Sequence, residues 1–152
     1  MRIRQYAYFA LFSESMPATE ITARLMIEPD KVMIKGSRRA EPPSPVKHAW
    51  EVICDDRGMT VDEQVRKVID RVRPCQAAIA ELTREPDALC WAVLEVVRYF
   101  DDQTGEEEEL SSPDAQLQKL RGQHHLLGWH LDREILTFLI AVNAEIDADE
   151  YG

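Results

Sequence analysis

Three histidines and one aspartate lie close together in the last quarter of the chain and have the chemistry of a metal site. Imidazole and carboxylate groups are suitable ligands for zinc or a similar ion. The spacing matches no established metal motif, and adjacent histidines on a helix point about 100° apart. The candidate ligands are His124, His125, His130 and Asp132. We favour the alternative, in which these side chains are solvated or cap a helix, and we expect no cofactor.

A second group of residues surrounds a proline-rich loop at 37–46 and has the chemistry to bind a small anion. Arginine offers fork-shaped donors to a carboxylate or phosphate, and an indole can form a stacking wall. The candidate ligand-binding residues are Lys35, Arg38, Arg39, His48 and Trp50. We favour the alternative, in which Trp50 belongs to the core and the cations are solvated. This surface is nevertheless the best candidate for a small ligand.

The acidic residues and the nucleophiles give weaker signals. The run from Asp101 to Glu109 lacks the alternating oxygen ligands of a calcium loop and is typical of a solvated loop or a protein contact. The terminal acids Asp147, Asp149 and Glu150 favour an edge strand over acid–base chemistry. The sequence contains no nucleophile-elbow motif and no glycine-rich phosphate loop, so it predicts no catalytic residue.

Charge and composition exclude several classes of partner. The chain has 152 residues and a net charge of −10, so it should repel nucleic acids and anionic membranes. The charge is uneven, because residues 1–47 hold more Lys and Arg than acids while most of the acidic excess follows Asp101. Such an asymmetry can bind a small anion or a protein, or orient subunits. No apolar run approaches the ~18–20 residues that span a membrane.

The cysteines indicate a reducing compartment. Cys54, Cys75 and Cys90 are far apart, form no C-x-x-C pair and have apolar neighbours. They are therefore interpreted as buried thiols, which fits a cytoplasmic location.

The hydrophobic pattern predicts one α+β domain over residues 1–152. Strands are expected at 2–14, 32–35, 48–54, 89–100 and 145–151, and helices after Ser15, at 60–84, from Ser112 and at 131–143. About five mostly antiparallel strands, covered by three to four helices, follow from this order. The first six elements match the split βαβ, ferredoxin-like order.

Local signals sharpen several of these elements. Thr60 and Glu63 have the spacing of a capping box. Pro74 interrupts the apolar stripe of the long helix, and a kink is expected near Arg73. The strand at 89–100 is apolar on both faces, so it should be central, whereas the alternating acidic strand at 145–151 should lie at an edge.

The order of several short segments resembles the bacterial DUF4279 family of small domains without an assigned function. The aromatic first strand is followed by residues 21–25 and 27–29, then by Lys35-Gly36 and by Trp50 opening a strand, and the tail at 131–151 ends in tyrosine. The resemblance implies a bacterial, cytoplasmic domain and brings no catalytic residue. Residues 101–129 are longer than the family suggests, and we treat them as a candidate insertion.

Two functions from different classes follow from these observations. The first is a non-enzymatic protein-interaction or binding module, including a homodimer or an immunity-protein-like role, and it predicts an open sheet edge or apolar patch. The second is a small-anion-binding domain or minor enzyme, and it predicts that Lys35, Arg38, Arg39 and Trp50 converge on a concave pocket.

Overall fold

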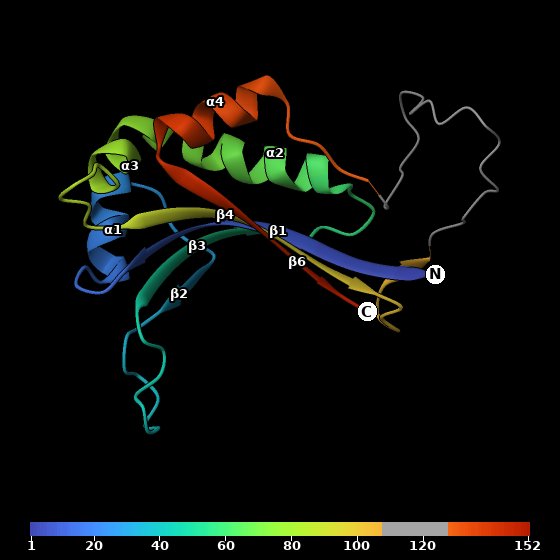
Figure 1. Ribbon diagram of the computed structural model, residues 1–152, viewed down its shortest axis with the longest axis horizontal. Helices are drawn as coiled ribbons and strands as arrows, with labels where there is room; N and C mark the ends of the chain where they lie inside the picture. Colours follow the sequence, from blue (N-terminus) through green and yellow to red (C-terminus); the bar gives the residue numbers. More distant parts are fainter. Residues whose placement is uncertain (108–127) are drawn as a thin grey trace.

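The protein has two layers, a twisted sheet and a set of helices on one of its faces (Figure 1). The computed structural model describes residues 1–107 and 128–152. The strands are β1 (Arg2–Ser13), β2 (Lys31–Met33), β3 (His48–Cys54), β4 (Trp91–Phe100), β5 (Glu106–Glu107) and β6 (Ala144–Tyr151). The helices are α1 (Ala18–Leu25), α2 (Val61–Val72), α3 (Gln76–Leu82) and α4 (Arg133–Ala141), and the 3-10 turn η1 (Arg73–Cys75) joins α2 to α3. The α+β class predicted from the sequence is confirmed.

The sheet is mixed, and the prediction of a mostly antiparallel sheet is wrong. The strand order is β2-β3-β1-β4-β6, and β5 pairs with the start of β1. Strand β6 runs parallel to β4, because α4 carries the chain back along the sheet before β6 begins. The ferredoxin-like order stays a prediction, since β5 and β6 lie outside that motif.

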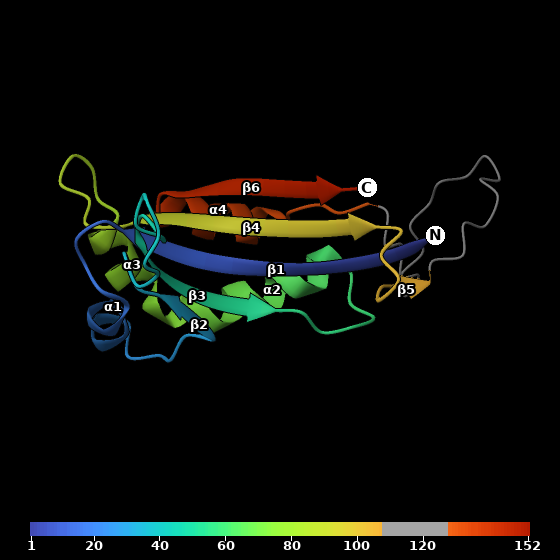
Figure 2. The same cartoon turned by 90° about the horizontal axis from the view of Figure 1, so that it is seen from below.

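Strands β1 and β4 occupy the centre of the sheet, as predicted for the strand at 89–100. Strand β1 pairs with β3 on one side and with β4 on the other, and β4 lies between β1 and β6. Both strands bury apolar side chains on both faces, as Phe9 and Phe12 do on β1. The acidic strand β6 lies at an edge, as its alternating sequence predicts (Figure 2).

Helix boundaries follow their sequence signals closely. The capping box of Thr60 and Glu63 opens α2, and Pro74 lies in η1, where the long helical segment changes from α2 to α3. Asn143 follows α4 with a φ of 52°, the left-handed conformation expected of a residue that ends a helix. Helix α1 begins after Ser15 as predicted, with Pro17 at its N-cap and no side-chain cap hydrogen bond. The helix predicted from Ser112 lies outside the described residues.

The main core lies between the sheet and the helices. Its largest fully buried side chains include Trp50, Phe9 and Phe138. The rings of Phe9 and Phe138 meet edge to face with centroids 6.0 Å apart, which joins β1 to α4. The indole Nε1–H of Trp50 donates to Thr22 Oγ1 at 3.1 Å, which fixes α1 against β3.

Residues 34–47 connect β2 to β3 and form a projecting hairpin, which we call the arm. The arm leaves one end of the sheet on the side away from α2, α3 and α4 (Figure 1). The backbone N–H of Gly36 donates to the Pro45 carbonyl, and the N–H of Arg38 donates to the Ser44 carbonyl, both at 2.8 Å. These bonds hold the two sides of the arm together. Among the described helices, none is long and apolar enough to cross a bilayer.

Candidate functional site

The second face of the sheet carries no helix among the described residues, and we call it the open face (Figure 2). Side chains alternate along each strand, so the strand register places them in rows across this face. From the arm end onward, the rows are Met33–Ala49–Phe12–Trp91, Lys31–Glu51–Ala10–Val93–Glu145, Ile53–Tyr8–Glu95–Asp147, Tyr6–Val97–Asp149 and Arg4–Tyr99–Tyr151. The open face therefore changes from apolar to acidic and aromatic along the strands.

The end of the open face near the arm is a small apolar cluster. Ala10, Phe12, Ala49 and Val93 are buried there without a helix above them. The rings of Phe12 and Trp91 lie 5.8 Å apart, and Trp91 is 38% exposed. The ammonium of Lys47, the last residue of the arm before β3, lies 3.9 Å from the Phe12 ring centroid. This cation covers the cluster and keeps its own charge in water.

Tyrosines dominate the other end of the open face. Tyr6 and Tyr8 stack with centroids 6.2 Å apart, and Tyr99 and Tyr151 stack at 5.0 Å across β4 and β6. The guanidinium of Arg4 lies 4.4 Å from the Tyr99 ring centroid, so at least one ring already accepts a cation.

Carboxylates from three strands lie between these two ends. Glu51 is almost fully buried and pairs with Lys31 at 3.4 Å. Glu95 stands beside Asp147 on β6, and Asp149 follows in the next row. Burial, opposed by hydrogen bonding with Tyr8 and reinforced by the charges of Asp147 and Asp149, raises the pKa of Glu95. The centre of the open face is therefore a site of negative charge.

Tyr6 and Tyr8 stay neutral at physiological pH. Burial, followed by hydrogen bonding with Tyr99, raises the pKa of Tyr6 to about 12. Burial and the charge of Glu95 also raise the pKa of Tyr8. Neutral phenols offer a hydroxyl and an aromatic face, so these side chains suit recognition of a cation.

A cavity of 490 Å³ lies at the end of the open face, where β1 is paired with neither β3 nor β5. Gln5 and Gln64 are among its lining residues, and their buried side-chain Oε1 atoms have no hydrogen-bond partner among the described residues. Their amide nitrogens are satisfied, because Gln5 donates to the Met59 carbonyl and Gln64 donates to the carbonyls of Gln5 and Asp56. Both signs of charge occur in its lining, as Arg57 and Asp55 illustrate, so its polar chemistry points to no single class of ligand.

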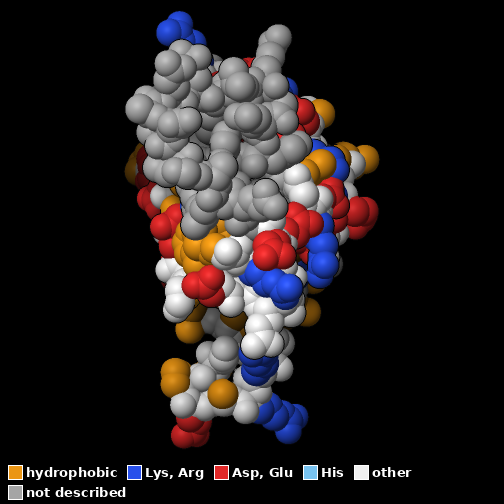
Figure 3. All heavy atoms as spheres, turned by 90° about the vertical axis from the view of Figure 1, so that its right-hand side faces the viewer, with side chains coloured by type: hydrophobic (Ala, Val, Ile, Leu, Met, Phe, Trp, Pro, Cys, Tyr) orange, Lys and Arg blue, Asp and Glu red, His pale blue; other side chains and the backbone are white. Residues whose placement is uncertain are grey.

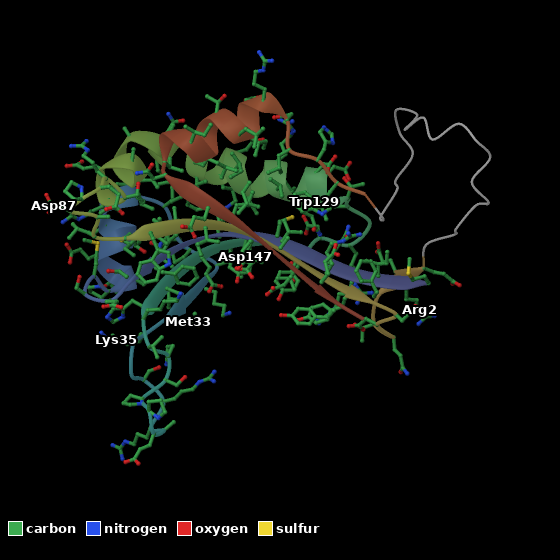
Figure 4. The ribbon with its side chains drawn as sticks, viewed as in Figure 1. Arg2, Met33, Lys35, Asp87, Trp129 and Asp147 are labelled. Atoms are coloured by element: carbon green, nitrogen blue, oxygen red, sulfur yellow. The ribbon has the colours of Figure 1, made fainter. Side chains whose placement is uncertain are left out.

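The residues predicted to bind an anion do not meet in one pocket. Trp50 is fully buried on the helix-covered side, as the alternative interpretation of the sequence expected, so it is no wall of a site in the arm. The backbone N–H of Lys35 donates to His48 Nδ1 at 3.1 Å, and Lys35 Nζ donates to the Glu14 carbonyl (Figure 4). Arg38 and Arg39 lie farther out on the exposed arm. Anion binding by the four polar members of the set stays a prediction.

The predicted metal ligands are only partly described. His124 and His125 lie outside the described residues. The backbone N–H of His130 donates to Asp62 Oδ1 at 2.8 Å, and its Nδ1 lies 2.7 Å from Asp62 Oδ2. Asp132 caps α4 by accepting from the Ile135 N–H at 2.9 Å and also pairs with Arg66. No group of three potential ligands occurs among the residues that the structure describes.

A comparison with protein-family models identifies the family. The model described as a domain of unknown function (DUF4279) matches residues 3–152. The chain belongs to this family. The family resemblance stated from the sequence is thereby confirmed over nearly the whole chain. Comparisons with curated proteins and with solved structures gave no match. The DUF4279 family supplies no activity, so functional inference depends on the open face and the arm.

Most residues of the open face were not predicted from the sequence. The acids at 147 and 149 were predicted to lie on an edge strand, which is where they lie, but no local pattern connects them with Tyr6, Tyr8 or Glu95. Two signals pointed to this site. Glu95 is the one acid within the apolar strand β4, and tyrosines recur with a period of two at the start of β1. Both signals place polar side chains on one face of strands that are internal to the sheet.

Proposed function

We propose that this DUF4279 domain binds another protein through the open face and acts without catalysis at that surface. The observation that carries the proposal is the mixture of carboxylates and tyrosines across β1, β4 and β6, with Glu95, Asp147 and Asp149 as its acidic centre. Tyrosine is enriched in protein-binding surfaces, because it offers a large apolar ring and a hydroxyl at a low entropic cost.

The partner should present lysine or arginine. A cation that contacts Asp147 and Asp149 relieves their repulsion with Glu95, whose pKa is raised first by burial and then by these two charges. The rings of Tyr6, Tyr8 and Tyr99 add faces on which a cation can lie. An acidic or phosphate-bearing partner would meet the same sign of charge on this surface and would be repelled.

The outer edge of β6 can pair with an extended segment of the partner. Among the described strands, β6 pairs only with β4, so its outer backbone groups are available to an extended segment. A strand that adds here gains main-chain hydrogen bonds and places alternate side chains over the open face. Lysine or arginine at those alternate positions would then lie beside Asp147 and Asp149.

A titration with a designed peptide tests the proposal. The probe is an extended peptide with alternating lysine and leucine, and its binding to the ¹⁵N-labelled protein is followed by NMR at low salt. We expect the shifted resonances to belong to β6, β4 and the start of β1. Asp147→Asn with Asp149→Asn should weaken binding about 2- to 30-fold, which corresponds to two surface ion pairs of about 0.2–1 kcal/mol each.

A matched variant controls for net charge. Glu81→Gln with Asp87→Asn removes the same two charges from exposed sites away from the open face (Figure 4), and it should leave binding unchanged. Equal weakening by both double variants would mean that only net charge matters, and would reject the open face as the binding site. Equal affinity for a peptide with glutamate in place of lysine would reject the proposed partner chemistry.

A further inference from the structure

The arm is an ordered, cationic projection whose most basic residues have no partner within the described part of the chain. It carries Lys35, Arg38, Arg39 and Lys47 against the single acid Glu41. Lys47 lies on the Phe12 ring and Lys35 donates to the Glu14 carbonyl, so both are occupied. The side chains of Arg38 and Arg39 make no ion pair, hydrogen bond or ring contact with the described residues.

The base of the arm is apolar and exposed. Ile34 is 60% exposed and Val46 is 67% exposed, and they flank the two sides of the hairpin. In the end-on view the arm extends beyond the body of the domain and carries Lys and Arg side chains together with apolar ones (Figure 3). A hairpin held by its own backbone bonds, with apolar residues at its base and arginines beyond them, has the form of an element that docks on a partner.

The arm and the acidic centre of the open face are complementary, but they sit apart in one copy. The arm leaves from β2 and β3, whereas Asp147 and Asp149 lie on β6 at the opposite edge of the sheet. The arm projects away from the sheet and does not fold across it (Figures 1 and 4). One copy therefore carries two complementary surfaces that do not touch each other. In a pair of copies related by a two-fold axis, the arm of each copy can contact the acidic centre of the other.

We propose that two copies of this chain form a reciprocal dimer in which the arm of each copy docks on the open face of the other. Arg38 and Arg39 of one copy meet Glu95, Asp147 and Asp149 of its partner, while Ile34 and Val46 cover the apolar end near Trp91. This inference rests on the proposed function and names a second copy as the protein that the open face binds.

The charges on β6 argue against the simplest alternative dimer. Two β6 edges paired with each other would bring carboxylates of the two copies together, because Glu145, Asp147 and Asp149 alternate along the strand. Like charges directly opposite each other on neighbouring strands destabilise the pairing. Arm exchange instead pairs opposite charges at both contacts.

Charge reversal in the full-length protein tests the dimer. Analytical ultracentrifugation at low salt should give a dimer for the unmodified chain. Arg38→Glu with Arg39→Glu reverses the arm, and Asp147→Arg with Asp149→Arg reverses the open face. Each double variant alone should weaken the dimer at least about 100-fold, because symmetry places the reversed charges at both contacts.

Mixing the two double variants provides the decisive measurement. Both contacts of a mixed dimer regain opposite charges, so an equimolar mixture should form a heterodimer although each variant alone is monomeric. Circular dichroism checks that both variants are folded, and the salt dependence of the unmodified dimer is an independent test if either is not. That dimer should dissociate as the salt rises from about 0.05 to 0.5 M.

The outcomes separate this inference from the proposed function. A monomeric unmodified chain, or dimers that survive both reversals, would overturn arm exchange. If a monomer of this kind still binds the lysine–leucine peptide through β6, the proposed function stands and only the identity of the partner is wrong. If it binds neither the peptide nor itself, both proposals fail.

Discussion

The two faces of the sheet are built by the same strands and have opposite characters. The helix-covered face is a continuous core of aliphatic and aromatic residues, with Trp50 and Phe9 fully buried. The open face has a small apolar cluster at one end and tyrosines and carboxylates beyond it. Because strand side chains alternate, one half of β1 and β4 is committed to stability while the other half is free to form a binding surface.

The faces also differ in how they satisfy their polar groups. On the helix-covered face, buried polar side chains bond to backbone, as Ser13 does with the Leu89 carbonyl and Thr83 does with the Val142 carbonyl. On the open face, polar side chains contact one another, as Glu95 does with Tyr8. Bonds to backbone lock the fold, whereas contacts between exposed side chains can be exchanged for contacts with a partner.

Removing one ring from each face should give the largest contrast. Phe9→Ala empties a fully buried site against Phe138 and should lower the free energy of unfolding by about 3–5 kcal/mol. Tyr151→Ala removes a ring of similar size that stacks on Tyr99 at the sheet edge. Its cost should be less than about a third of that of Phe9→Ala. Urea unfolding measures both, and similar costs would mean that the open face is part of the core.

The hydroxyl of Thr22 tests how much its hydrogen bond with the Trp50 indole stabilises the helix-covered face. Thr22→Val keeps the shape of the side chain but leaves the buried Trp50 N–H without its acceptor. The expected cost is about 1–3 kcal/mol in urea unfolding. Thr137→Val is the matched control, because its exposed hydroxyl donates only to the Arg133 carbonyl of its own helix. An equal loss of unfolding free energy in Thr137→Val would mean that the Trp50–Thr22 hydrogen bond has no special role in stability.

The smallest effect is expected from the charge on the open face, and it depends on pH. Burial and neighbouring carboxylates raise the pKa of Glu95, so the folded protein binds this proton more tightly than the unfolded chain does. Stability is therefore lost as pH rises through the unfolded and then the folded pKa. Glu95→Gln should raise the free energy of unfolding by about 0.2–1 kcal/mol at pH 7, the size of a cross-strand pair.

The same variant should lose its advantage in acid. At pH 3.5, below the unfolded glutamate pKa of about 4.3, the carboxyl is protonated in both states and resembles the amide. Glu81→Gln on α3 removes one exposed charge and corrects for the change in net charge. An equal gain from Glu95→Gln at both pH values would show that charge crowding is not a property of the open face.

Much of the fold could be read from the sequence because its signals are local. The β-favouring run from His48 to Cys54 gave the bounds of β3, and the capping box gave the start of α2. Pro74 marked the change of helix, since a missing N–H and a ring clash act on the nearest turn. Asn143 ended α4 because asparagine tolerates a positive φ.

The sheet order and the binding surface required information that is not local. No pattern within β6 shows that it runs parallel to β4, because that direction depends on how α4 crosses the sheet. Strand β5 falls within the acidic run predicted to be a solvated loop or a protein contact, since two residues carry no periodicity. The open face brings together Tyr8, Glu95 and Asp147, which are distant in the sequence and meet only through register.

The position of β1 has a kinetic consequence. Strands β3, β4 and β5 all pair with β1. These partners are far from β1 in the sequence, at 48–54, 91–100 and 106–107. The hairpin of β2 and β3 closes over the short span of the arm, but β1 cannot complete its pairing until β4 arrives from far along the chain. Closing such long loops costs entropy before any contact compensates it, so we expect folding on the slow, millisecond-to-second end of the range for small domains, limited by the insertion of β1 between its neighbours.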